Sequence, residues 1–137
     1  MDYRNFARAN VKWPVLITTD DSSRDGVTIN VSPSGAYIRC GNPLRLNEVF
    51  DMTIDLPNSE WFIEATAEVV FSNIYGPDDK ISPRGMGVRF LNITSKDRKI
   101  IAKEVLQHLQ ADKVEIEQWK LQSLQTLIID ENETKKA

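Results

Sequence analysis

Hydrophobic and polar residues alternate along the first two thirds of this 137-residue chain, and the pattern ends near Asn92. Successive side chains of a strand leave opposite faces of the sheet, so this alternation indicates strands with one buried face. Six short runs show it: 11–18, 27–32, 35–40, 50–56, 63–71 and 86–91. Turn-forming residues separate the runs, and the absence of a helical pattern between them excludes parallel βαβ crossovers. We therefore expect a mainly β fold, a small six-stranded antiparallel barrel.

The pattern becomes helical after Asn92, and no Pro or Gly occurs from Ser95 onward. Thr94 or Ser95 suits the N-cap, with Asp97 in the first turn. The apolar stripe shifts register around residues 111–112, which leaves open one long helix or two shorter ones. The expected segments are a flexible N-terminal arm over 1–10, the barrel over 11–94, the helix or helices over 95–129, and a frayed tail over 130–137.

Composition excludes several classes of function. The 17 Lys and Arg against 20 Asp and Glu give a net charge of −3, which argues against a nucleic-acid coat or a polybasic membrane clamp, so no DNA or RNA partner is expected. A lone Cys40 and a lone His108 exclude an intrachain disulfide and a cysteine- or histidine-based metal site. Neither a signal peptide nor a run of ~20 apolar residues occurs, so we expect a cytoplasmic protein without membrane insertion.

No set of acid, base and nucleophile residues emerges that would support catalysis. His108 falls in the helical region with no acid or nucleophile that can be placed beside it, and Cys40 alternates with Ile38 as a small buried residue would. We therefore expect no enzyme, no catalytic residues, no metal and no cofactor.

One segment, Asn-Val-Ser-Pro-Ser-Gly at 30–35, closes one expected strand and opens the next. Val27, Ile29 and Val31 alternate on the core face, so Asn30 and Ser32 are expected to lie side by side outside the barrel. The proline and the glycine suit the second and fourth positions of a tight turn, and a glycine leaves the backbone open to a flat ligand. On its own, the pattern is more simply explained as a polar strand end that runs into a turn.

Two arginines, Arg4 and Arg8, precede the first expected strand. The first 19 residues hold three positive charges against one negative charge, in a chain that is acidic overall. A guanidinium pairs with phosphate oxygens in a bidentate fashion, and its face stacks on a purine. This pair therefore suits a local anion site, although a solvated basic N-terminus would look the same.

Taken together, these two features resemble the signature of the PilZ domain, which is Arg-x-x-x-Arg and then, after one strand and a hairpin, Asn-x-Ser-x-x-Gly. The resemblance covers roughly residues 3–109. It includes Pro-Val-Leu-Ile at 14–17, Gly-Ala-Tyr-Ile at 35–38 and Gly-Met-Gly-Val-Arg-Phe at 85–90. It implies a six-stranded antiparallel β-barrel with a C-terminal helix, which in many members binds the bacterial second messenger cyclic di-GMP.

The resemblance also implies a role for each motif residue. Arg4 and Arg8 would grip the phosphates and stack on guanine. Asn30 and Ser32 would contact a guanine edge and the sugar-phosphate, and Gly35 would keep the surface open beneath the base. Asn30 stands where the family often has Asp. A tyrosine precedes the first motif arginine in place of another basic residue, which leaves open whether one nucleotide or an intercalated pair binds.

The implied function is that of a stand-alone cyclic di-GMP receptor whose arm becomes ordered on binding and presents a new surface to a protein partner. The alternative is a nucleotide-independent PilZ-type interaction module of pilus or motility assembly, although such relatives have typically lost both motifs. The C-terminal stripe, with Val114, Leu121, Leu124 and Ile128, should fold back on the barrel or pair with a second copy, and self-association is favoured.

Overall fold

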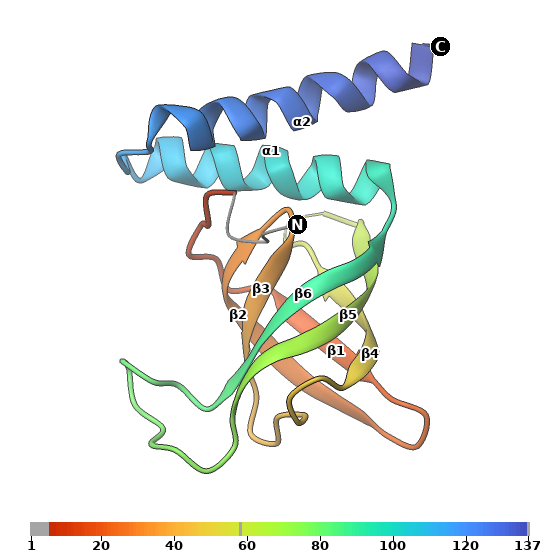
Figure 1. Ribbon diagram of the computed structural model, residues 1–137, viewed down its shortest axis with the longest axis vertical. Helices are drawn as coiled ribbons and strands as arrows, with labels where there is room; N and C mark the ends of the chain where they lie inside the picture. The colour runs from red at the N-terminus through yellow and green to blue at the C-terminus, as the bar shows by residue number, and fades with distance from the viewer. Residues whose placement is uncertain (1–5, 58, 137) are drawn as a thin grey trace.

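The computed structural model describes residues 6–57 and 59–136, and it contains a closed barrel of antiparallel strands in the order β1-β2-β3-β6-β5-β4 (Figure 1). The strands are β1 (Pro14–Thr18), β2 (Ser23–Ser32), β3 (Gly35–Arg39), β4 (Val49–Asp55), β5 (Phe62–Asn73) and β6 (Gly85–Ile93). This architecture confirms the expected fold class. Each strand buries alternate apolar residues inside the barrel, and Ile17, Ile54 and Ile63 are completely inaccessible to solvent.

The pairing of β2 with β3 shifts by one residue between Thr28 and Asn30, so Ile29 is an extra residue in β2. A bulge of this kind moves the inward and outward positions by one. Thr28 is therefore fully buried, whereas Val27 is 40% exposed. The expectation that Val27 and Ile29 face the core is wrong for this reason, since Ile29 is only half-buried. Val31, beyond the bulge, is fully buried as expected.

The helical region forms two helices, α1 (Ser95–Ala111) and α2 (Gln118–Lys136), which resolves the alternative left open by the sequence. The side chain of Thr94 caps α1 by accepting a hydrogen bond from the backbone N–H of Asp97. The chain leaves α1 through Lys113, whose φ of 53° lies in the left-handed region and ends the helix. In Figure 1, α1 lies across one end of the barrel, and α2 runs back along the side of α1 that faces away from the barrel.

The hairpin of α1 and α2 is tied to the barrel by apolar burial. Ile101, Val105 and Leu109 of α1 belong to the same buried cluster as the barrel interior. Leu124 of α2 is fully buried too, so α2 folds back on its own chain. The favoured self-association through this region stays a prediction, as does fraying of the tail, which is helical here as far as Lys136.

Asp97 joins the start of α1 to the side of the barrel. Its two carboxylate oxygens accept hydrogen bonds from the indole N–H of Trp61 at 3.0 Å and from the backbone N–H of Glu64 at 3.3 Å. The ammonium group of Lys96 lies 3.9 Å from the centre of the Trp61 ring. These contacts fix the point from which α1 crosses the barrel.

Candidate functional site

The chain leading into β1 runs beside β2 and is tied to it at two places. Ala9 and Val31 exchange two backbone hydrogen bonds of 3.0 Å. Closer to β1, the hydroxyl of Thr28 donates to the carbonyl of Val11 at 2.6 Å and accepts from the N–H of Trp13 at 2.9 Å. The buried hydroxyl therefore has a partner both as donor and as acceptor. These contacts fix the course of the chain past β2.

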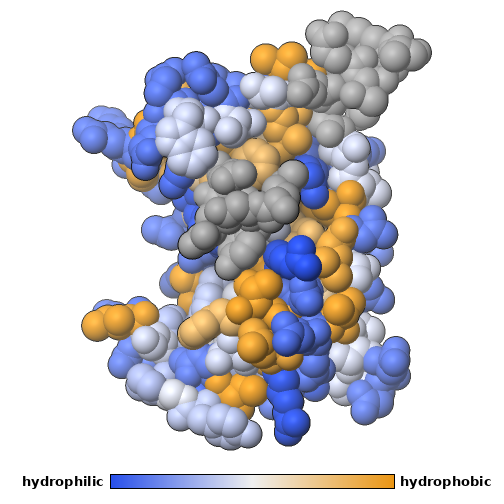
Figure 2. Space-filling view, viewed as in Figure 1, coloured by the Kyte–Doolittle hydropathy of each residue, from blue (hydrophilic) through white to orange (hydrophobic). Residues whose placement is uncertain are grey.

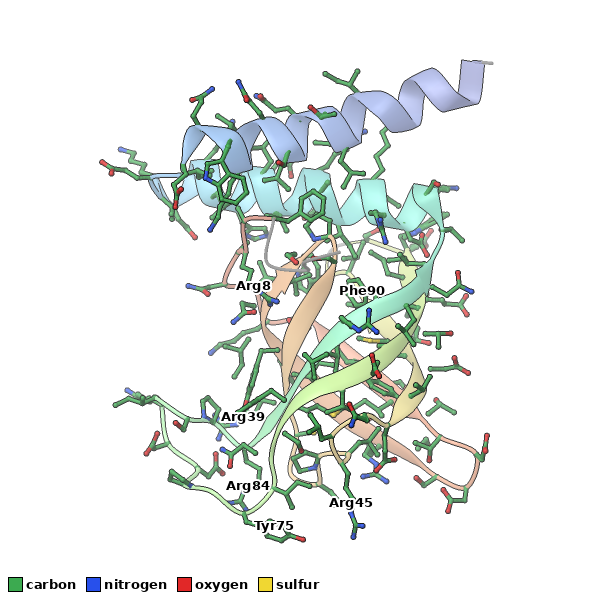
Figure 3. The ribbon with its side chains drawn as sticks, viewed as in Figure 1. Arg8, Arg39, Arg45, Tyr75, Arg84 and Phe90 are labelled. Carbon is green, nitrogen blue, oxygen red and sulfur yellow. The ribbon has the colours of Figure 1, made fainter. Side chains whose placement is uncertain are left out.

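This course brings Arg8 to Asn30, 22 positions later in the sequence. Nη1 of Arg8 donates a hydrogen bond of 2.7 Å to Oδ1 of Asn30. Figure 3 shows Arg8 beside β2 at the end of the barrel covered by α1, whereas Arg45 and Arg84 lie toward the opposite end. One residue from each expected motif is thus present in a single, half-buried contact.

Ser32 is placed differently from the expectation, because its side chain is fully buried rather than outside the barrel next to Asn30. Its hydroxyl accepts a hydrogen bond of 3.2 Å from the backbone N–H of Ser34 and lies 3.2 Å from the Ser34 hydroxyl. The cause is local: Ser32 immediately precedes the turn, and its oxygen satisfies a backbone donor of that turn. Its role toward a ligand stays a prediction.

Gly35 closes the turn opposite Ser32, in the fourth position, as the sequence predicts. A Cβ atom at this position would overlap the carbonyl oxygen of Val88 in β6. Glycine is therefore required for the close approach of β3 to β6, a structural reason that the sequence did not indicate. Its expected role beneath a base stays a prediction.

Arg4 lies outside the described residues, so its role also stays a prediction. Of the expected arm over 1–10, residues 6–10 are described, and Ala7 and Ala9 are buried at 8% and 1% exposure. This part of the arm packs against the barrel. Its mobility in solution stays a prediction.

Sequence reasoning missed a cavity that opens beside Asn30. It has a volume of about 450 Å³, and Tyr37, Phe71, Lys80 and Ile81 are among its lining residues. Its walls come from β2, β3, β5 and the β5–β6 loop over residues 74–84, so only the strand order brings them together. The sequence feature that could have indicated this cavity is the Gly-Met-Gly segment at 85–87. Its second glycine pairs with both aromatic residues of the cavity, Tyr37 on one side and Phe71 on the other.

Burial also determines the chemistry of the lone cysteine. Cys40 is 6% exposed, and loss of hydration raises the pKa of its thiol above the ordinary value of 9.0. The protonated thiol is a poor nucleophile, so Cys40 acts as a small apolar residue. Among residues 6–57 and 59–136, no three His, Cys, Asp or Glu side chains gather as they would around a metal ion. Neither described helix is both long and apolar enough to cross a membrane.

Comparison with known proteins agrees with the fold. The family model of the PilZ domain matches residues 2–107. Comparison with curated protein sequences gives no match. Among solved structures, the inhibitor of motility MotI/DgrA from Bacillus subtilis aligns with a TM-score of 0.67 and 21% identity, over 82% of this chain and 53% of that one. This chain therefore spans about half the length of that relative.

Two isolated domains also align. The PilZ domain of YcgR from Escherichia coli, solved with c-di-GMP, has a TM-score of 0.58 and 13% identity, over 79% of this chain and 92% of that one. The PilZ domain of CeSA from a cellulose-synthesizing bacterium has a TM-score of 0.51 and 16% identity, over 74% and 96%. At these identities the likeness concerns the fold.

Proposed function

Since this chain belongs to the PilZ domain family, we propose that it is a cytoplasmic receptor for cyclic di-GMP that passes the signal to a protein partner. The family consists of receptor and adaptor modules, and no catalytic family is indicated. Arg4, Arg8, Asn30, Ser32 and Gly35 are the residues proposed to bind the nucleotide.

The observation that carries this proposal is the hydrogen bond between Arg8 and Asn30. A guanidinium has five N–H donors in a planar fork, so one arginine is able to bridge a side-chain oxygen and a phosphate oxygen. The amide of Asn30 offers both a donor and an acceptor to the edge of a base. The contact supports the proposal, because it joins a group suited to phosphate to a group suited to the edge of a base, which is the pair that a nucleotide requires.

The relatives support the same proposal from a different direction. The YcgR domain was solved with c-di-GMP, and MotI is an inhibitor of motility. The ligand of the YcgR domain supports cyclic di-GMP as the ligand proposed here, and the role of MotI supports a protein partner in motility. Because this chain spans 53% of MotI, the partner of the whole relative remains a proposal here.

Isothermal titration of the full chain with cyclic di-GMP tests the proposal. Arg8→Ala and Arg4→Ala should each weaken binding at least tenfold, because a charge-assisted bond to phosphate contributes about 1.5–3 kcal/mol. Arg45→Ala is the matched control, since Arg45 lies toward the other end of the barrel, and it should bind like the wild type. A wild-type protein that does not bind would support the nucleotide-independent module instead, and two arginine variants with unchanged affinity would contradict the proposed site.

Ordering of the arm requires a separate measurement, hydrogen exchange with and without nucleotide. The backbone N–H of Ala9 already donates to Val31, so the gain in protection should fall mainly on the residues before Ala9. Unchanged protection across residues 1–10 would contradict ordering as the signal, even if the nucleotide binds.

A further inference from the structure

The cavity beside Asn30 has a floor suited to a flat ring. Tyr37 of β3 and Phe71 of β5 both pair with Gly87 of β6, so the two aromatic residues flank a position without a side chain. Their ring centres are 6.2 Å apart and the rings are tilted by 40°. A Cβ atom on Gly87 would lie 3.5 Å from Cβ of Phe71 and 3.7 Å from Cδ2 of Tyr37, within the space that the rings share. The glycine therefore keeps this space open.

The aromatic surface is accessible and partly fixed in position. Phe71 is 56% exposed, so its ring is open to a ligand that approaches from solvent. The Tyr37 hydroxyl donates a hydrogen bond of 2.7 Å to the carbonyl of Pro83, which holds its ring against the loop. Figure 2 shows hydrophobic side chains gathered on this face of the barrel and at the tip of the β5–β6 loop.

The loop that forms the outer wall is ordered by its own hydrogen bonds. Nδ2 of the buried Asn73 donates to the carbonyls of Pro77 at 2.9 Å and Ser82 at 3.1 Å. The carboxylate of Asp79 accepts from the backbone N–H groups of Ile81 and Ser82 at 2.9 and 2.8 Å. A preordered wall lowers the entropic cost of binding. It presents the cation of Lys80 and the apolar side chain of Ile81, which is 92% exposed.

Resting on the proposed function, we propose that this cavity is a stacking subsite for one guanine of cyclic di-GMP. The base lies over Gly87 against the rings of Tyr37 and Phe71. Asn30 joins this subsite to the phosphate site, because it lines the cavity and also accepts the hydrogen bond from Arg8. Lys80 supplies positive charge at the cavity mouth for an anionic nucleotide. A cavity of about 450 Å³ is within the usual range for small-molecule sites and exceeds what one purine needs.

Two phenylalanines of β5 allow a matched test, since Phe71 and Phe62 are 56% and 55% exposed and only Phe71 lines the cavity. In titrations of the full chain with cyclic di-GMP, Phe71→Ala should weaken binding roughly tenfold, and Phe62→Ala should leave it unchanged. Phe71→Leu should weaken binding as well, whereas Phe71→Trp should retain it, because stacking requires an aromatic face. Lys80→Met should weaken binding more at low salt than at high salt.

The outcomes separate this inference from the proposed function. If the wild type binds and Arg8→Ala does not, but Phe71→Ala binds like the wild type, the stacking subsite is wrong while the receptor function stands. Equal losses in Phe71→Ala and Phe62→Ala would also overturn it, since only one of them lines the cavity. A wild type that fails to bind overturns both.

Discussion

Gly35 of β3 lies so close to the carbonyl of Val88 in β6 that no Cβ atom fits between them. Gly35→Ala should therefore destabilise the barrel by about 1–3 kcal/mol, the usual cost of forcing extra volume into a packed site. Thermal unfolding followed by circular dichroism measures this. Gly41→Ala is the control and should change little, because nothing lies within 4 Å of its added Cβ. A Gly35→Ala protein as stable as the wild type would contradict the requirement for glycine at this position.

Asp97 is expected to stabilise the junction between α1 and the barrel. Asp97→Ala removes the acceptor of two hydrogen bonds, from Trp61 and from the backbone of Glu64. Leaving partly buried donors unpaired should cost about 1–3 kcal/mol in the free energy of unfolding. Asp20→Ala, at an exposed position, should change it by less than about 0.5 kcal/mol. Urea unfolding compares the two, and equal effects would contradict the assigned role.

Leu124 is expected to hold α2 on its own chain. Leu124→Ala should cost about 2–5 kcal/mol, the range for a buried leucine. If the packing is within one chain, the unfolding midpoint of the wild type should not depend on protein concentration.

Self-association through the helical region is a separate prediction. Light scattering should find the full chain larger than a monomer and a form truncated after Ala111 monomeric. A full-length protein that stays monomeric at high concentration would contradict the predicted self-association.

The stability should fall as the pH rises above about 9. Burial raises the pKa of the Cys40 thiol above 9.0, and burial also raises the pKa of Tyr37 above 10.0. Both groups ionise first in the unfolded chain, so their contribution is complete below the unfolded pKa and is lost as pH rises through the folded pKa. Urea midpoints at pH 8, 9 and 10 measure the loss. Cys40→Ala should reduce the loss of stability between pH 9 and 10. If the urea midpoint of this variant falls with pH as steeply as that of the wild type, other groups cause the loss.

Alternation alone predicts β1 and β4 well, because one face of each strand is buried without interruption. In β5 it holds as far as Val69, but Phe71, which it places on the buried face, is 56% exposed because the pairing with β6 shifts between these two residues. It fails in β2, where Ile29 adds a residue that no pattern of hydrophobicity reveals. The proximity of Arg8 to Asn30 depends on the backbone pairing of Ala9 with Val31 and was implied only by the family resemblance. The aromatic cavity could not be predicted, because Tyr37 and Phe71 meet only through the strand order.

The extra residue at Ile29 divides β2 into two segments that differ in their pairing. Before it, residues 23–27 of β2 pair with β1, and after it Val31 pairs with Ala9 of the incoming chain. Both halves pair with β3, but on the other side they have different neighbours, and each keeps its own phase of inward and outward side chains. Deleting Ile29 would force both halves into one phase, which would either expel Thr28 from the core or turn Asn30 away from Arg8. The length of this strand is therefore as constrained as its composition.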